Sequence, residues 1–260
     1  MPKIEPASTG LLVRRFCLTL LLSFLVAPIA AAQTVPENTP YARVNTFGFI
    51  AAYANDSSHM LLGTAERRKL LDFGASYSRR LFMNRIVNWQ YSVELLPVAL
   101  ESDPLSRTII RQVTPTVETT ILNDGPLDTC APQAFKYSYM GPKNVIYSGT
   151  ETYFCYGRQW TIGEAFSPIG FQWNFRPRHK LQPFLVGHGG EMYSTRPIPV
   201  AEAGSFNFTF DIGGGLELYR TKSSSVRAEY RFHHISNSYT AAENPGIDSG
   251  LFQITYAFGR

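Results

Sequence analysis

The chain has 260 residues, of which 17% are charged and 13% are aromatic, and its formal net charge is +4. A soluble globular protein usually carries about a quarter charged residues, so this composition does not fit that class. The small positive charge indicates no nucleic-acid partner and suits an anionic lipid surface.

The N-terminus has the layout of a secretory signal peptide. Three positively charged residues precede an apolar run at residues 16–26, which is too short to span a bilayer well. Small residues follow, with a cleavage site after Ala30 or Ala32. We therefore predict a signal peptide at residues 1–32 and one domain at residues 33–260. The alternative to the signal peptide is an N-terminal anchor helix.

Alternation of apolar and polar residues is the main signal in the rest of the chain, and it is typical of strands with one oily face. The clear segments are residues 87–95, 169–175, 206–218, 226–232 and 252–258. The weaker segments are residues 46–55, 70–82 and 181–193. The last of these carries glycine on both faces, so the side of the sheet that each residue faces stays open. Together these segments predict eight strands.

The connections between these segments alternate in length. Tight polar turns are expected at residues 83–85, 177–180 and 221–224. Longer connections are expected at residues 56–69, 101–161, 198–205 and 239–247. Short periplasmic turns and long external loops are typical of bacterial outer-membrane barrels, and the aromatic-rich last segment agrees with this. We predict an all-β, eight-stranded antiparallel transmembrane barrel in the bacterial outer membrane, rather than a soluble sandwich.

An eight-stranded barrel has an interior only wide enough for side chains. The charged side chains expected there should form a buried, mutually neutralising network: Asp72, Glu94, Asp211, Glu217, Arg227, Glu229 and Arg231. A diffusion pore is therefore not expected.

Two cysteines remain beyond the signal peptide, Cys130 and Cys155. An even pair in an exported chain predicts one disulfide. Both lie in the predicted external loop at residues 101–161, so the disulfide would cross-link two parts of that loop. Their spacing does not match a metal site.

Three polar residues extend the oily face of the last two strands. Continuing the alternation of residues 226–232 places His234 and Ser236 on the outer wall, and extending residues 252–258 backward places Asp248 there. A histidine can take the proton of a serine hydroxyl, and a carboxylate can fix the histidine tautomer. Such a triad on the lipid face would act on a lipid ester. The alternative is that these residues only mark where the strand leaves the membrane.

The same region resembles a known family. His-His-Ile-Ser-Asn at residues 233–237 and Asn-Pro-Gly-Ile-Asp-Ser at residues 244–249 are similar to the signature of the lipid A 3-O-deacylase (PagL) family, also called acyloxyacyl hydrolases. The local resemblance covers roughly residues 231–258. It implies an eight-stranded outer-membrane barrel that hydrolyses the ester-linked hydroxyacyl chain at the 3-position of lipid A, with lipopolysaccharide and membrane lipids as partners.

The resemblance also implies roles for individual residues. Ser236 would be the nucleophile and His234 the base, and Asn244 would help to bind the oxyanion with a backbone amide near residues 238–239. Two positions depart from the family pattern: Asp248 stands where the family has glutamate, and Tyr239 replaces a small residue. No metal or organic cofactor is implied.

Other candidates point to weaker hypotheses. His188 lies among glycines, and His233 should point to the opposite face of the strand from His234. We therefore interpret both as structural residues of the barrel. The glycines at residues 213–215 follow no strand-to-helix transition and are not a phosphate loop. The rival to the esterase is a non-catalytic outer-membrane barrel, structural or adhesive, with a decayed motif. The sequence leaves the oligomeric state open.

Overall fold

The computed structural model describes residues 41–114, 125–126 and 133–260, which contain strands and two short 3-10 turns but no α-helix. None of these residues lies in a helix whose length and hydropathy would let it cross a bilayer. The predicted signal peptide lies outside them. The elements are β1 (Asn45–Ala54), β2 (Lys69–Met83), β3 (Val87–Thr114), β4 (Gly125–Pro126), β5 (Gln133–Met140), η1 (Pro142–Asn144), β6 (Ile146–Phe175), β7 (Leu181–Ser194), η2 (Ala201–Ala203), β8 (Phe206–Tyr219), β9 (Ser224–Ser236) and β10 (Ile247–Gly259).

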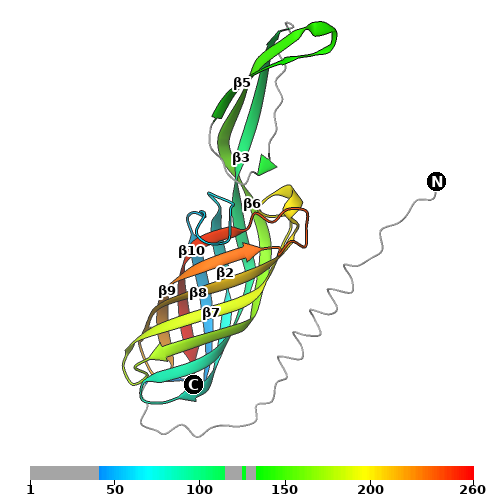
Figure 1. The fold of residues 1–260 in the computed structure, drawn as a ribbon. Coiled ribbons are helices and arrows are strands. Elements are labelled where there is room, and N and C mark those ends of the chain that lie inside the picture. Colours follow the sequence, from blue (N-terminus) through cyan, green and yellow to red (C-terminus); the bar gives the residue numbers. More distant parts are fainter. Residues whose placement is uncertain (1–40, 115–124, 127–132) are drawn as a thin grey trace, which may run out of the picture. The chain divides into compact units, whose positions relative to one another are not determined.

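Eight of these strands close into an antiparallel barrel (Figure 1). Barrel strands that follow one another along the chain pair directly, including β3 with β6, and β1 pairs with β10 to complete the ring. A closed ring pairs the backbone groups of every strand and leaves no open edge. The predicted eight-stranded antiparallel barrel is therefore confirmed.

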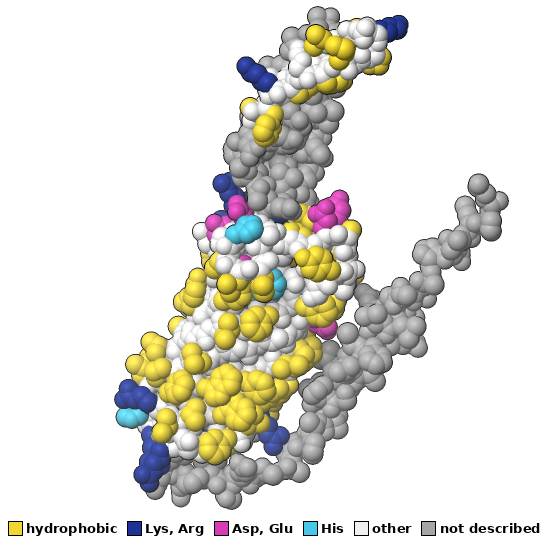
Figure 2. Space-filling model, in the orientation of Figure 1, with side chains coloured by type: hydrophobic (Ala, Val, Ile, Leu, Met, Phe, Trp, Pro, Cys, Tyr) yellow, Lys and Arg dark blue, Asp and Glu magenta, His cyan; other side chains and the backbone are white. Residues whose placement is uncertain are grey.

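Side chains alternate between the two faces of the wall. In β9 and β10 the odd-numbered residues are buried from Ser225 to Ile235 and from Leu251 to Ala257, while large apolar residues between them face outward. Figure 2 shows hydrophobic side chains gathered over the outer face of the barrel. The sequence left open which residues of β7 face the interior. The structure shows that the inward residues are Gln182, Phe184, Val186 and His188.

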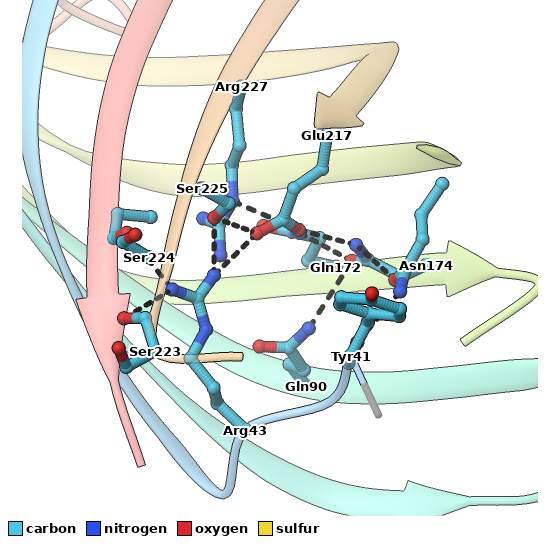
Figure 3. A network of polar contacts seen from close by, with 12 residues as sticks. Tyr41, Arg43, Gln90, Gln172, Asn174, Glu217, Ser223, Ser224, Ser225 and Arg227 are labelled. Carbon is cyan, nitrogen blue, oxygen red and sulfur yellow. Dashed lines mark hydrogen bonds and ion pairs between the residues drawn. The ribbon is translucent and has the colours of Figure 1, made fainter. Parts of the chain in front are cut away.

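The interior holds most of the predicted charges in two groups, whereas the buried Asp72 has no ion-pair partner among the described residues. At one end, the buried carboxylate of Glu217 accepts hydrogen bonds from Arg43 at 2.6 Å, Asn174 at 2.6 Å and Ser225 at 2.5 Å (Figure 3). Further along, Arg231 binds Glu94 at 2.8 Å. Buried charges must be paired in this way to be tolerated in a dry interior. A cavity of about 20 Å³ lies beside the second group, and Asp72, Glu94 and Arg231 are among the residues that line it.

The segment predicted as one long external loop, residues 101–161, consists largely of strand in its described part, which the sequence analysis did not predict. β3 and β6 stay paired from Glu101↔Thr161 to Thr114↔Ser148, and β5 pairs with the outer part of β6. The alternation of Phe135, Tyr137 and Tyr139 with polar residues was the signal for β5. Pro104 and the register shifts around it break the alternation of β3, which is why its outer part does not read as a strand.

Candidate active site

The centre of the candidate site is a histidine–aspartate pair at the external end of β9 and β10. The strand register places His234 directly opposite Asp248. His234 Nδ1 lies 2.6 Å from Asp248 Oδ1, and because an ionised carboxylate can only accept, the imidazole donates its Nδ1 proton. Asp248 is fully buried, whereas 12% of the His234 side chain is exposed. The Nε2 edge of the ring is therefore left to act as a base.

Ser236 lies two residues beyond His234 on the same strand and on the same outer face, where both are partly exposed. Side chains at positions i and i+2 of a strand are about 7 Å apart at Cα and point the same way. Ser236 Oγ makes no hydrogen bond to any residue that the structure describes, so it is not yet bound to His234. Catalytic hydrogen bonds are often long without substrate and tighten only in the complex.

Asp248 has a second set of partners that the sequence did not indicate. Its Oδ2 accepts hydrogen bonds from the backbone amides of Leu61 and Leu62, both at 2.7 Å. These amides belong to the external connection between β1 and β2. Backbone amides stabilise the ionised form of a carboxylate, which is the form that can hold the imidazole.

Asn244 lies in the connection between β9 and β10, close to the end of β9. Its Oδ1 accepts the backbone N–H of Asn237 at 3.0 Å, while its Nδ2 donates to no group in the described part of the chain. The side chain is half-buried. The amide is thus fixed through its oxygen, and its N–H₂ remains able to donate to a substrate oxygen.

Asn237 organises this connection. The buried side chain donates to Glu243 O at 2.6 Å and to Ala203 O, and it accepts the N–H of Tyr239 at 2.8 Å. Ser238 and Tyr239 both have positive φ, so the chain turns sharply here. Of the two amides expected near an oxyanion, the N–H of Tyr239 is occupied. The N–H of Ser238 has no partner among the residues described.

An apolar surface on β8 adjoins the His234–Asp248 pair, on the side of β9 away from β10. In the register between β8 and β9, Phe208 lies opposite Ser236 and Phe210 lies opposite His234. Both phenylalanines are exposed on the outer face of the barrel. A hydrocarbon chain in this position would run past the hydroxyl and the imidazole.

The remaining histidine candidates face the barrel interior. His188 and His233 are buried, and His188 Nδ1 lies 3.2 Å from Asp211 and 3.1 Å from Arg231. Glu94, His188 and Asp211 offer ligand atoms within 4.8 Å of one another, as a metal would need. Arg231, however, donates to Glu94 and lies in the same cluster, so these groups form an ion-pair network around a cation that the protein itself supplies.

The predicted disulfide lies outside what can be described. Cys130 is not among the described residues, and only the backbone of Cys155 is described. The pairing therefore stays a prediction.

The family model described as lipid A 3-O-deacylase (PagL) matches residues 132–257, which include β9, most of β10 and the connection between them. The resemblance to this family is thereby confirmed. No curated protein matches the chain.

Several solved structures are similar to this chain. The crystal structure of the outer membrane enzyme PagL is 13% identical, with a TM-score of 0.46, over 82% of this chain and 99% of that chain. Neisserial surface protein A (NspA) is 12% identical, with a TM-score of 0.40, over 83% and 97%. The outer membrane protein OprG from Pseudomonas aeruginosa is 8% identical, with a TM-score of 0.39, over 86% and 100%.

Proposed function

Because residues 132–257 match the lipid A 3-O-deacylase family, we propose that this chain is an outer-membrane esterase that removes the 3-O-linked hydroxyacyl chain from lipid A. The observation that carries the proposal is the His234–Asp248 pair, which lies beside Ser236 on the outer wall of the barrel. An ester of a membrane lipid would reach such a site from the hydrocarbon side. The outward apolar side chains of the wall fit an outer-membrane location.

In the first half of the reaction, Ser236 Oγ attacks the carbonyl carbon of the acyl ester and His234 Nε2 takes the hydroxyl proton. Asp248 holds the Nδ1 proton and stabilises the imidazolium that forms. The bond between the carbonyl carbon and the 3-oxygen of the sugar then breaks. His234 returns its proton to that oxygen, and an acyl-enzyme remains on Ser236.

In the second half, water attacks the acyl-enzyme while His234 again acts as the base. The hydroxy fatty acid leaves and the serine hydroxyl is restored. In both halves a tetrahedral intermediate carries negative charge on the former carbonyl oxygen. The Nδ2 of Asn244 and the amide of Ser238 are the donors available for this oxyanion. Neither half needs a metal ion or an organic cofactor.

Substrate orientation follows from the surfaces around the pair. The acyl chain would lie over Phe208 and Phe210, whose side chains are exposed to the same side as Ser236 and His234. The sugar and its phosphates would then lie at the external rim, where polar side chains and loops are found.

The test is mass spectrometry of lipid A after incubation of lipopolysaccharide with purified, reconstituted protein. We expect the wild type to release one hydroxyacyl chain and Ser236→Ala to release none. Ser224→Ala is a matched control, because Ser224 starts the same strand at its other end. It should behave as the wild type. Lipid A that keeps all its acyl chains after incubation with the wild type would instead favour the non-catalytic barrel, and equal release by the wild type and Ser236→Ala would show that Ser236 is not the nucleophile.

One observation favours that second candidate, an adhesive barrel. β5 and the outer part of β6 carry stacked tyrosines, with ring centroids 6.3 Å apart for Tyr137 and Tyr139 and 5.3 Å apart for Tyr139 and Tyr147. Tyr139 is exposed. Such a surface takes no part in the proposed hydrolysis, and exposed tyrosines are enriched where proteins bind one another.

A further inference from the structure

The external connection between β1 and β2, residues 55–68, folds over the start of β10. The amide of Ala65 donates to Gly246 O at 3.0 Å, and the amide of Ser58 donates to Asp248 O at 3.1 Å. Isolated bridges join Ser57 to Ser249 and Ala65 to Ile247. The connection is thus attached to the strand that carries the acid of the candidate triad.

The end of this connection is fixed to the rest of the barrel by Arg68. Its buried guanidinium binds Asp103 at 3.0 Å and donates to Pro199 O at 3.1 Å. Its backbone N–H donates to Ser57 Oγ at 2.9 Å, which ties the two ends of the connection together. A segment held at both ends in this way can define the position of the groups between them.

We infer that residues 61–63 are a positioning element of the active site, in which the successive backbone amides of Leu61 and Leu62 hold the Asp248 carboxylate against His234 and Gly63 lets the connection approach it closely. This inference rests on the proposed esterase function. The amides of Leu61 and Leu62 bind Oδ2, and Oδ1 is thereby turned to the imidazole. Successive amides that converge on one anion form a backbone nest.

The arrangement also explains how an aspartate can serve at this position. A carboxylate on a short side chain has few ways to reach a ring on the neighbouring strand. Here the amides of the connection fix its second oxygen. A longer side chain is therefore not required to keep the first oxygen directed at the imidazole. The leucine side chains take no part, because 77% of Leu61 and 67% of Leu62 is exposed.

Gly63 is the residue whose identity the element requires. A Cβ at this position would lie 2.6 Å from Asp248 N and 3.1 Å from Asp248 Cγ. Both distances are shorter than ordinary van der Waals contact, and the nearest atom belongs to the backbone. Any side chain here must push the connection away from Asp248.

The test combines Gly63→Ala with the bulkier Gly63→Val and with the matched control Gly189→Ala, where an added Cβ meets nothing within 4 Å. A displacement of about 1 Å in a catalytic group can lower the rate about 10²-fold. We therefore expect Gly63→Ala to lower kcat 10- to 100-fold with KM unchanged. The kinetics are measured on reconstituted protein, and the electrophoretic mobility of the unheated sample checks that each variant is folded. Gly63→Val should lose more, and Gly189→Ala should match the wild type.

A double-mutant cycle distinguishes positioning from a general structural effect. In an Asp248→Asn background the Gly63→Ala change should have no further effect on kcat, because the group it positions is already lost. An equal loss in both backgrounds would overturn the inference. So would full activity of Gly63→Val.

A second readout does not depend on activity. Proton NMR of the protein with ¹⁵N-labelled histidine should show a downfield Nδ1–H resonance of His234, assigned by its loss in His234→Gln. We expect Gly63→Val to lose or shift this resonance and Gly189→Ala to keep it. If the wild type releases no acyl chain, the proposed function fails, and the resonance alone still decides whether the amides hold Asp248. An unchanged resonance in Gly63→Val would refute the inference.

Discussion

Replacement of Asp248 by asparagine is the most informative perturbation of the candidate triad. The aspartate uses both oxygens as acceptors: one takes the imidazole N–H and the other takes the amides of Leu61 and Leu62. An asparagine has only one acceptor oxygen. Facing that oxygen to the amides keeps two hydrogen bonds, whereas facing it to His234 keeps one, and a lost buried hydrogen bond costs about 1–3 kcal/mol.

The amide group of the asparagine should therefore point its N–H₂ at His234. The ring can then only accept at Nδ1, so its proton moves to Nε2, and Nε2 can no longer take the proton of Ser236. The same change of tautomer in serine hydrolases lowers kcat about 10⁴-fold, which corresponds to about 5.4 kcal/mol in the barrier. We expect a loss of this size in Asp248→Asn with KM little changed, because the carboxylate does not face the substrate.

The assay is release of hydroxy fatty acid from lipopolysaccharide by reconstituted protein, followed over a range of substrate concentrations. Asp56→Asn is the matched control, since Asp56 is exposed in the same external connection, and among the described residues its carboxylate accepts only the N–H of Ser57. It should retain wild-type kcat. If Asp248→Asn kept activity within about tenfold of the wild type, the histidine would not depend on this carboxylate, and the reasoning from tautomers would be refuted.

Two further changes test the oxyanion donor and the barrel interior. Asn244→Asp keeps the oxygen that accepts the Asn237 amide but removes the Nδ2 donor; we expect kcat to fall about 10²–10³-fold, and a rise in KM alone would contradict this. Arg231→Met leaves the buried carboxylates around it unpaired and should lower the free energy of unfolding in urea by about 3–5 kcal/mol. Lys222→Met, at an exposed turn, is its control, and a loss below about 1 kcal/mol for Arg231→Met would show that Glu94 is stabilised in another way.

Much of the fold could be predicted from local pattern. A period of two in hydropathy fixes which side chains face lipid and which face the interior, because a strand turns each successive side chain to the opposite face. This was sufficient for the number of barrel strands and for the inward charges such as Glu217 and Arg231. It also placed His234 and Ser236 on the outer wall. In β7, glycine occupies both faces of the strand. The same reasoning could not predict which residues of β7 face the interior, because glycine has no side chain whose hydropathy marks a face.

The sequence did not reveal the outer parts of β3 and β6. Their pairing continues from Glu101↔Thr161 outward, but there the strands leave the barrel, so no constant difference between a lipid face and an interior face is imposed on them. Pro104 and shifts of register interrupt what alternation remains. In β5, where the residues from Ala134 to Met140 are exposed or half-buried on both faces, the hydropathy signal is correspondingly weak.

The sequence by itself determined the barrel, its two faces and the side on which a serine, a histidine and an aspartate emerge. Those properties depend on side-chain chemistry at a fixed spacing along each strand. Only the tertiary structure decided what holds the acid in place, because the groups that bind Asp248 are backbone amides nearly 190 positions earlier in the chain. Every residue except proline has such an amide, so no residue type marks it; only Gly63, by the space it leaves, indicates that the two segments touch.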